Sequence, residues 1–129
     1  MKRREFEKLV VRALDELPPE FKERLDNVDV VVEDEPSREQ REESALAPDE
    51  TLYGLYQGVP LTERTHEYGL VAPDKITIFQ KPIEEDCATP EEMVMEINLT
   101  VQHEIAHFFG LDDDTLEEIE DRKYEERER

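Results

Sequence analysis

The sequence predicts one small domain of the α+β class, in which helices and strands occupy separate stretches of the chain. Its length of 129 residues is typical of one domain, and a hydrophobic content of 36% suffices for a single modest core. The hydrophobic periodicity gives the order helix, three strands, long helix and a final helix that starts near Thr115. We find no internal repeat, so we expect residues 1–129 to form a single domain.

The first predicted helix lies near the N-terminus, where apolar residues recur at helical spacing. These residues are Phe6, Leu9, Val10, Ala13, Leu14 and Leu17. Pro18 and Pro19 end this helix, because proline disrupts a helix interior. A short turn or helix is predicted for the segment "PEFKERL" that follows.

Three short stretches show the composition and alternation of β-strands. The first is "NVDVVVE" at residues 27–33, in which alternate valines share one face. The second is "TLYGLYQ" at residues 51–57, and the third is "KITIFQ" at residues 75–80, which Pro82 ends. These stretches predict a sheet of about three strands.

The stretches between the strands and helices are predicted to be loops. Residues 33–50 are charged and almost free of apolar residues, so we expect a long exposed loop there. Residues 61–74 are interpreted as a connection, and residues 83–90, "IEEDCATP", as another loop.

A long helix is predicted over residues 90–109 by signals at both of its ends. Thr89 can cap the helix, Pro90 suits its first position, and Glu92 completes a capping box. Gly110 stands where a helix commonly ends in glycine. A helix of this length spans ~30 Å. Its apolar stripe consists of Val94, Ile97, Val101, Ile105 and Phe108.

The charge and composition exclude several classes of function. Charged residues make up 40% of the chain and the net charge is -20, which argues against a nucleic-acid partner because phosphates would be repelled. There is no apolar run of the ~20 residues needed to cross a membrane and no signal-peptide pattern, so we expect a cytoplasmic protein without a membrane partner. The abundance of Glu and Arg, with few Asn, Gln, Met and Cys, is typical of heat-adapted proteins. The sequence specifies no oligomeric state.

The stretch "VQHEIAHFFGLDDD" contains two of the chain's three histidines, four residues apart on the predicted long helix. His103 and His107 therefore face the same side, one turn apart, and their imidazoles can bind one Zn²⁺. Glu104 lies one step around the helix, where it can act as general base toward a metal-activated water. The alternative is that these residues are only the polar end of a buried helix. His66, the third histidine, lies in a predicted connection and is interpreted as a surface residue rather than a ligand.

A third metal ligand is predicted just after the helix. Gly110 lets the chain turn back, and Asp113 lies ten residues after His103, so its carboxylate can reach the same metal. Three protein ligands leave a fourth position open, which is the catalytic arrangement of zinc. Asp112 and Asp114 compete for this role, although the spacing favours Asp113, and capping of the final helix is the alternative for the other two.

The chain resembles the minimal zincins, a family of short bacterial metallopeptidases with a metzincin-like site. The resemblance rests on "HEIAHFFGLDD", "LPPEFKERLDNVDVVVEDEPS", "LYGLYQGVPLTER", "APDKITIFQKPIE" and "LEEIE", and so covers nearly the whole chain. It implies a zincin-like fold, a Zn²⁺ cofactor, His103, His107 and Asp113 as metal ligands and Glu104 as catalytic base. The third ligand of metzincins is usually His, and here it would be Asp.

Two departures from the larger metzincins bear on activity. No methionine follows the motif, so the methionine turn beneath their sites is missing. The 16 residues after Asp113 leave no room for their C-terminal subdomain, so we expect only half a cleft.

The function expected from the motif and the resemblance is zinc-dependent hydrolysis of peptide bonds in a peptide or protein substrate. A tyrosine could stabilise the oxyanion, and the candidates are Tyr53, Tyr56 and Tyr68. The strand at residues 75–80 is nominated as the cleft edge on which an extended peptide lies, with a sheet-interior strand as the alternative. A hypothesis from another class is a non-catalytic metal-binding or interaction protein on the same scaffold. The acidic run at residues 112–118, which would repel acidic substrates, favours that second hypothesis.

Overall fold

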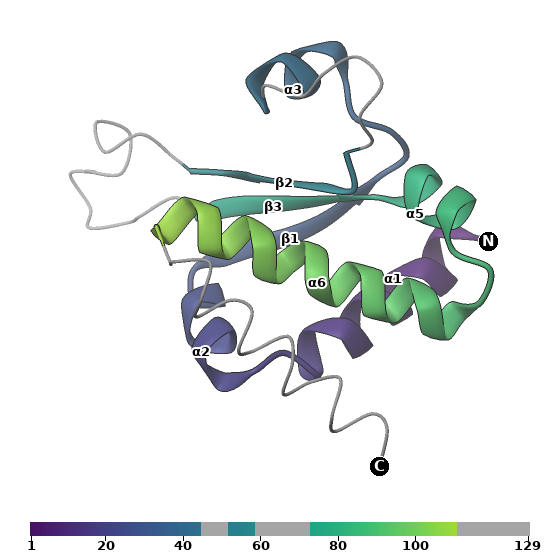
Figure 1. Ribbon diagram of the computed structural model, residues 1–129, viewed down its shortest axis with the longest axis horizontal. Helices are drawn as coiled ribbons and strands as arrows, with labels where there is room; N and C mark the ends of the chain where they lie inside the picture. Colours follow the sequence, from purple (N-terminus) through teal and green to yellow (C-terminus); the bar gives the residue numbers. More distant parts are fainter. Residues whose placement is uncertain (45–51, 59–72, 111–129) are drawn as a thin grey trace.

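The structure is a computed structural model that describes residues 1–44, 52–58 and 73–110. Within these ranges the helices are α1 (Arg3–Asp15), α2 (Pro19–Lys22), the 3-10 turn η1 (Glu23–Leu25), α3 (Arg38–Glu43), α5 (Gln80–Asp86) and α6 (Pro90–Phe109). The strands are β1 (Val28–Glu33), β2 (Gly54–Gln57) and β3 (Asp74–Phe79) (Figure 1). The predicted α+β class is confirmed. The final helix predicted from Thr115 lies outside the described residues.

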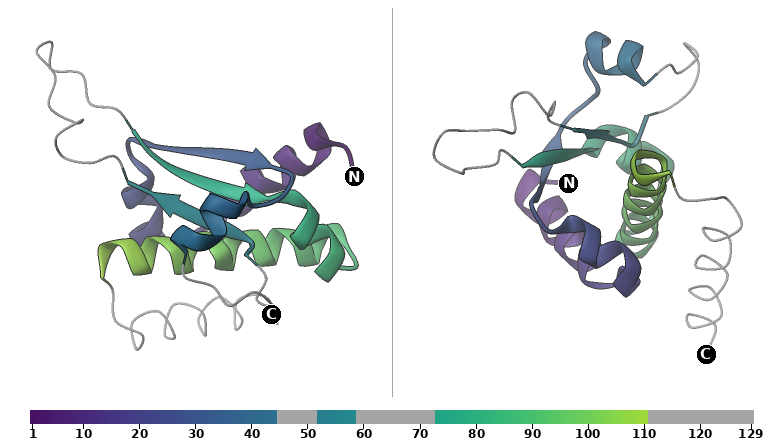
Figure 2. Two further views of the ribbon diagram at one scale, coloured as in Figure 1. Left: turned by 90° about the horizontal axis from the view of Figure 1, so that it is seen from above. Right: turned by 90° about the vertical axis from the view of Figure 1, so that its left-hand side faces the viewer.

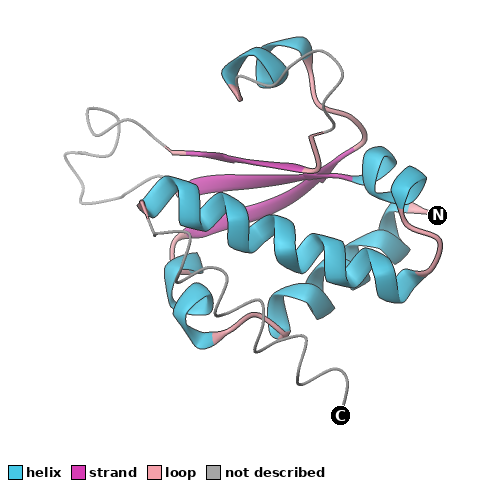
Figure 3. Ribbon diagram, in the orientation of Figure 1, coloured by secondary structure: helices cyan, strands magenta, loops and turns pink. Residues whose placement is uncertain are grey.

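The three strands form one mixed sheet in the order β1-β3-β2 (Figure 3). β1 runs parallel to β3, with Val30 opposite Ile76, and β2 runs antiparallel to β3, with Tyr56 opposite the same Ile76. β3 is therefore the central strand, and its nomination as a cleft edge is wrong. Both of its sides are occupied by neighbouring strands. Its nearly continuous burial reflects cover on both faces, since Ile76 and Ile78 belong to the main core and Phe79 packs with Leu52 and Leu55. Among the described strands, β2 is the edge strand that contacts α6.

α1 and α6 cover the same face of the sheet and pack against each other (Figures 1 and 2). The apolar stripes of both helices meet the sheet in one core, which confirms the stripe predicted for α1 and most of that for α6. The exception is Phe108, which is 46% exposed. The core consists of Phe6, Leu9, Val10, Ala13, Leu17, Phe21, Tyr56, Ile76, Ile78, Ile83, Met93, Val94, Ile97, Val101, Ile105 and Ala106.

A buried polar contact fixes α6 against the end of α1. The side-chain amide of Asn98 donates to the backbone carbonyl of Ala13 at 2.8 Å, and the Gln102 amide donates to Asn98 Oδ1 at 2.6 Å. Asn98 and Gln102 are fully buried. The carbonyls in the last turn of a helix lack partners within the helix, so Asn98 supplies one from a neighbouring helix.

Both ends of α6 follow the local signals of the sequence. Thr89 Oγ1 accepts the backbone N–H of Glu92 at 3.2 Å, and Gly110 ends the helix in the left-handed region at a φ of 69°. The predicted capping box is formed only in part, because Glu92 Oε2 accepts the N–H of Ala88, at 2.6 Å, rather than that of Thr89. The predicted bounds, residues 90–109, are confirmed.

Two predicted loops contain helices instead. Within residues 33–50 the chain forms α3, and Ser37 and Gln40 cap it reciprocally: Ser37 Oγ accepts from Gln40 N at 3.1 Å and Gln40 Oε1 from Ser37 N at 2.8 Å. The start of residues 83–90 belongs to α5, where Ile83 is buried. Proline is tolerated in the first turn of a helix, so Pro82 is compatible with α5.

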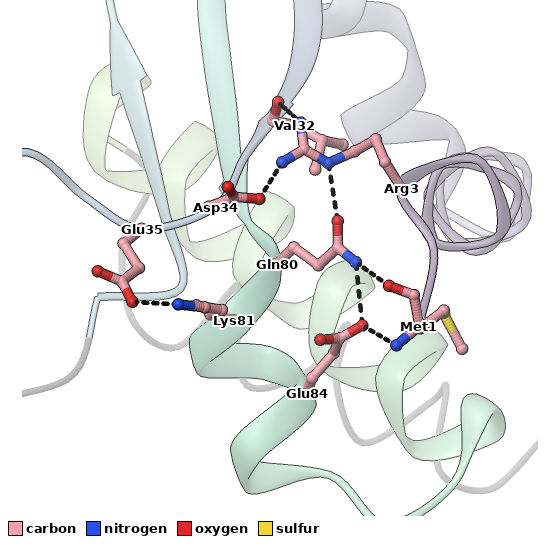
Figure 4. Close-up of polar contacts among 8 residues, drawn as sticks. All are labelled: Met1, Arg3, Val32, Asp34, Glu35, Gln80, Lys81 and Glu84. Atoms are coloured by element: carbon pink, nitrogen blue, oxygen red, sulfur yellow. Dashed lines mark hydrogen bonds and ion pairs between the residues drawn. The ribbon is translucent and has the colours of Figure 1, made fainter.

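The start of the chain is tied to α5 and β1 by polar contacts (Figure 4). The Met1 amino group lies 3.2 Å from Glu84 Oε1, and the Gln80 amide donates to the Met1 carbonyl at 2.9 Å. Arg3 donates to Gln80 Oε1 and to the Val32 carbonyl, each at 2.8 Å. Within the described ranges, no helix has both the length and the apolar character needed to span a membrane.

Candidate metal centre

The last two turns of α6 carry the three residues that the sequence singled out. His103 and His107 are exposed on the surface of the helix, four residues apart. Neutral imidazole nitrogens one turn apart on a rigid helix are a suitable donor pair for Zn²⁺. The exposed position of both rings leaves their nitrogens accessible to a metal, and a polar helix end without a metal would expose them in the same way.

Glu104 points from α6 toward the edge strand β2. Its Oε1 accepts the backbone N–H of Tyr56 at 2.9 Å, a contact between residues 48 positions apart. Partial burial raises the pKa of the Glu104 carboxyl, while the Tyr56 N–H and the charges of His107 and His103 act in the opposite direction. A partly buried carboxylate beside two histidines has the environment of a catalytic base.

An aromatic cluster holds β2 against the end of α6. The Tyr56 ring stacks on Phe108, with centroids 4.0 Å apart, and Phe109 lies edge-on to both rings. The Arg24 guanidinium lies 4.9 Å from the centre of the Phe109 ring. This cluster fixes the strand position from which the Tyr56 N–H reaches Glu104.

Two of the tyrosines named as oxyanion candidates donate hydrogen bonds from their hydroxyl groups to carboxylates. Tyr56 donates to the Asp74 carboxylate at 2.5 Å, and Tyr53 donates to Asp86 at the end of α5. The hydrogen bond to Asp86 raises the pKa of Tyr53 above its ordinary range. The third candidate, Tyr68, lies outside the described residues.

Glu96 is a further acidic residue near the site that sequence reasoning missed. It lies two turns before His103 on α6, and burial raises its pKa while the hydroxyl of Thr100 and the charge of His103 lower it. The Thr100 hydroxyl is 3.5 Å from Glu96 Oε1. The seven-residue spacing between Glu96 and His103 was the available signal, since it places both on one side of the helix.

The described residues contain two of the three predicted metal ligands. Asp112, Asp113 and Asp114 lie outside them, as does His66. Among the residues that are described, no group of three or more His, Cys, Asp or Glu is placed to hold a metal ion. The assignment of Asp113 as third ligand therefore stays a prediction.

A family model described as zincin-like metallopeptidase matches residues 25–123 of the chain. The match extends from the end of η1 through the whole sheet and α6, so it includes Tyr56, His103, Glu104 and His107. No curated protein matches the chain.

Proposed function

Because the chain belongs to the zincin-like metallopeptidase family, we propose that it is a zinc-dependent peptidase with Glu104 as its general base. The proposed metal ligands are His103, His107 and Asp113. The observation that carries the proposal is the placement of Glu104 between two exposed histidines, with its carboxylate held by a backbone N–H of the edge strand.

A bound Zn²⁺ would supply Lewis acidity, which polarises a carbonyl and lowers the pKa of water. Glu104 Oε1 is engaged by the Tyr56 N–H, so we assign the moving proton to Oε2. Glu104 would accept a proton from the attacking water and return it to the nitrogen of the leaving amine. The raised pKa of Glu104 favours the first step, because it makes the carboxylate a stronger base.

The proposed substrate is a peptide in extended conformation. β2 is an edge strand of the described sheet beside Glu104, and an extended peptide can align with such an edge through main-chain groups other than the Tyr56 N–H, which Glu104 holds. The net charge of -20 favours peptides with Lys or Arg near the scissile bond.

The test compares cleavage of a peptide mixture by the zinc-loaded wild type and by Glu104→Gln. The variant keeps the size of the side chain and an acceptor oxygen but removes the base, so zinc should be retained while activity falls by roughly a hundredfold or more. Glu85→Gln makes the same change at an exposed position on α5 and should behave like the wild type.

Two results would count against the proposal. Absence of metal-dependent cleavage by the wild type would favour a non-catalytic metal-binding or interaction protein on this scaffold. Equal cleavage by the wild type and Glu104→Gln would exclude Glu104 as the base.

A further inference from the structure

β2 contacts α6 at two points, and the distance between these points is similar along the strand and along the helix. Gly54 lies against Thr100, and Tyr56 donates its N–H to Glu104. Tyr56 follows Gly54 by two strand residues, or ~7 Å. Glu104 follows Thr100 by four helix residues, or ~6 Å. The strand therefore runs alongside the helix over this distance, in the same direction (Figure 1).

Gly54 leaves no space for a side chain. A Cβ at this position would lie 2.6 Å from Thr100 Cγ2, 3.1 Å from the Thr77 carbonyl oxygen and 3.4 Å from Ile78 Cδ1. The first distance is far below the ~3.5–4.0 Å at which carbon atoms normally meet. The glycine is thus required by the close approach of strand and helix.

The side of β2 that faces α6 carries the Tyr56 N–H. Phe79 N donates to the Tyr53 carbonyl at 2.9 Å, which places Tyr53 among the residues whose backbone pairs with β3. Antiparallel strands alternate in this respect, so Tyr56, three residues later, directs its backbone groups to the opposite side. The bond from Tyr56 to Glu104 agrees with this alternation.

We propose that Gly54 is a positioning residue for Glu104: the missing side chain lets β2 approach α6 closely enough for the Tyr56 N–H to hold the carboxylate. The catalytic consequence rests on the proposed function, whereas the positioning itself is a property of the metal-free chain. Gly54 touches neither substrate nor metal in this scheme and acts through the strand.

The geometry gives the effect expected of Gly54→Ala. With Thr100 kept in its rotamer, the 2.6 Å contact is relieved only when strand and helix separate by about 1 Å. The distance from Tyr56 N to Glu104 Oε1 would then grow from 2.9 Å to beyond the range of a hydrogen bond. Thr100→Ser removes the offending Cγ2 while keeping the hydroxyl beside Glu96, so it should restore the contact when combined with Gly54→Ala.

The experiment measures hydrogen exchange of the Tyr56 amide by NMR in the full, metal-free chain. Exchange should become about tenfold faster in Gly54→Ala and in Glu104→Ala, because each loses the hydrogen bond. Exchange should stay slow in Glu104→Gln, which keeps an acceptor, in Thr100→Ser and in the double variant Gly54→Ala/Thr100→Ser. Slow exchange at Ile97, buried in α6, verifies that each variant is folded.

Unchanged Tyr56 exchange in Gly54→Ala, or fast exchange in the double variant, would overturn the proposal. If Gly54→Ala does not fold, the double variant decides: a folded protein with slow Tyr56 exchange supports the proposal, and an unfolded one overturns it.

Peptide cleavage by the zinc-loaded proteins supplies the second readout. Gly54→Ala should lower kcat about tenfold or more and leave the zinc content near the wild-type value, since Glu104 loses the donor from β2 while the two histidines stay in place on α6. Unchanged kcat despite fast Tyr56 exchange would overturn the positioning role. If the wild type cleaves no peptide, the proposed function fails, while the exchange data still decide whether Gly54 positions Glu104.

Discussion

Replacement of Asn98 by alanine should strongly destabilise the fold, and the size of the effect follows from its two hydrogen bonds. The Asn98 side chain is fully buried, donates to the Ala13 carbonyl at 2.8 Å and accepts from the Gln102 amide at 2.6 Å. Without Asn98, both partners are buried polar groups that have lost a bond, and each such loss costs ~1–3 kcal/mol. The two losses sum to ~2–6 kcal/mol, and since single substitutions rarely cost more than ~4 kcal/mol, we expect Asn98→Ala to lower the free energy of unfolding by about 2–4 kcal/mol.

The assay is equilibrium unfolding in urea, followed by circular dichroism, with thermal unfolding as a second measure. A loss of this size should lower Tm by roughly 10–20 °C in a domain of this length. In a Gln102→Leu background, Asn98→Ala should cost ~1 kcal/mol less, because the Gln102 amide is no longer left without its acceptor. Glu85→Ala, at an exposed position, should change stability by less than ~0.5 kcal/mol. If Asn98→Ala changes stability as little as Glu85→Ala, the reasoning about the buried bonds is refuted.

Two further predictions concern the metal. His103→Ala and His107→Ala should each abolish stoichiometric zinc binding near neutral pH, because each removes one of two imidazoles on the same face of α6. Elemental analysis of the dialysed protein measures the zinc content. Full zinc content in both variants would place the site elsewhere. Asp113→Ala should weaken zinc binding far more than Asp112→Ala, because Asp113 has the favoured spacing from His103. Competition with a chelator measures the affinity. Equal losses would mean that the acidic run binds metal without a defined third ligand.

The features that the sequence predicted correctly have local causes. The bounds of α6 follow from Thr89 at one end and Gly110 at the other, and each acts on backbone groups of its own helix turn. The strands follow from alternation, since alternate residues of each strand, such as Val30, Tyr56 and Ile76, face the main core. His103 and His107 share a face for the same kind of reason, because a helix brings residues four apart onto one side.

The missed helices lack the signal on which helix prediction mainly depends. α3 carries no apolar stripe, and its one buried residue is Gln40, so only the capping pair Ser37 and Gln40 marked it in the sequence. α5 was obscured because Pro82 was interpreted as the end of a strand, although proline also suits the first turn of a helix. Both segments contained a local capping or first-turn signal for a helix. The loop predictions followed instead from the charge of the first segment and the proline of the second.

The central position of β3 and the contact of Glu104 with β2 depend on pairing between distant segments. The alternation of Ile76 and Ile78 was a usable signal for a strand but not for its place in the sheet, because Asp74, Lys75 and Thr77 are polar. The bond from the Tyr56 N–H to Glu104 has no such signal, because a backbone donor is present at almost every residue and leaves no mark on the side-chain pattern.

The placement of Glu104 shows how a motif within one helix depends on a glycine in a strand. His103, Glu104 and His107 are brought together by helix geometry alone, and any helix would do the same. The orientation of the carboxylate depends in addition on a donor from β2, which reaches it because Gly54 allows the strand to lie against Thr100. Most substitutions of Tyr56 keep its backbone donor. The orientation of Glu104 is therefore most sensitive to substitution of the residues that set the distance between strand and helix. We therefore expect substitutions at Gly54 to impair Glu104 more than conservative aromatic substitutions at Tyr56, although Tyr56 is the residue in contact.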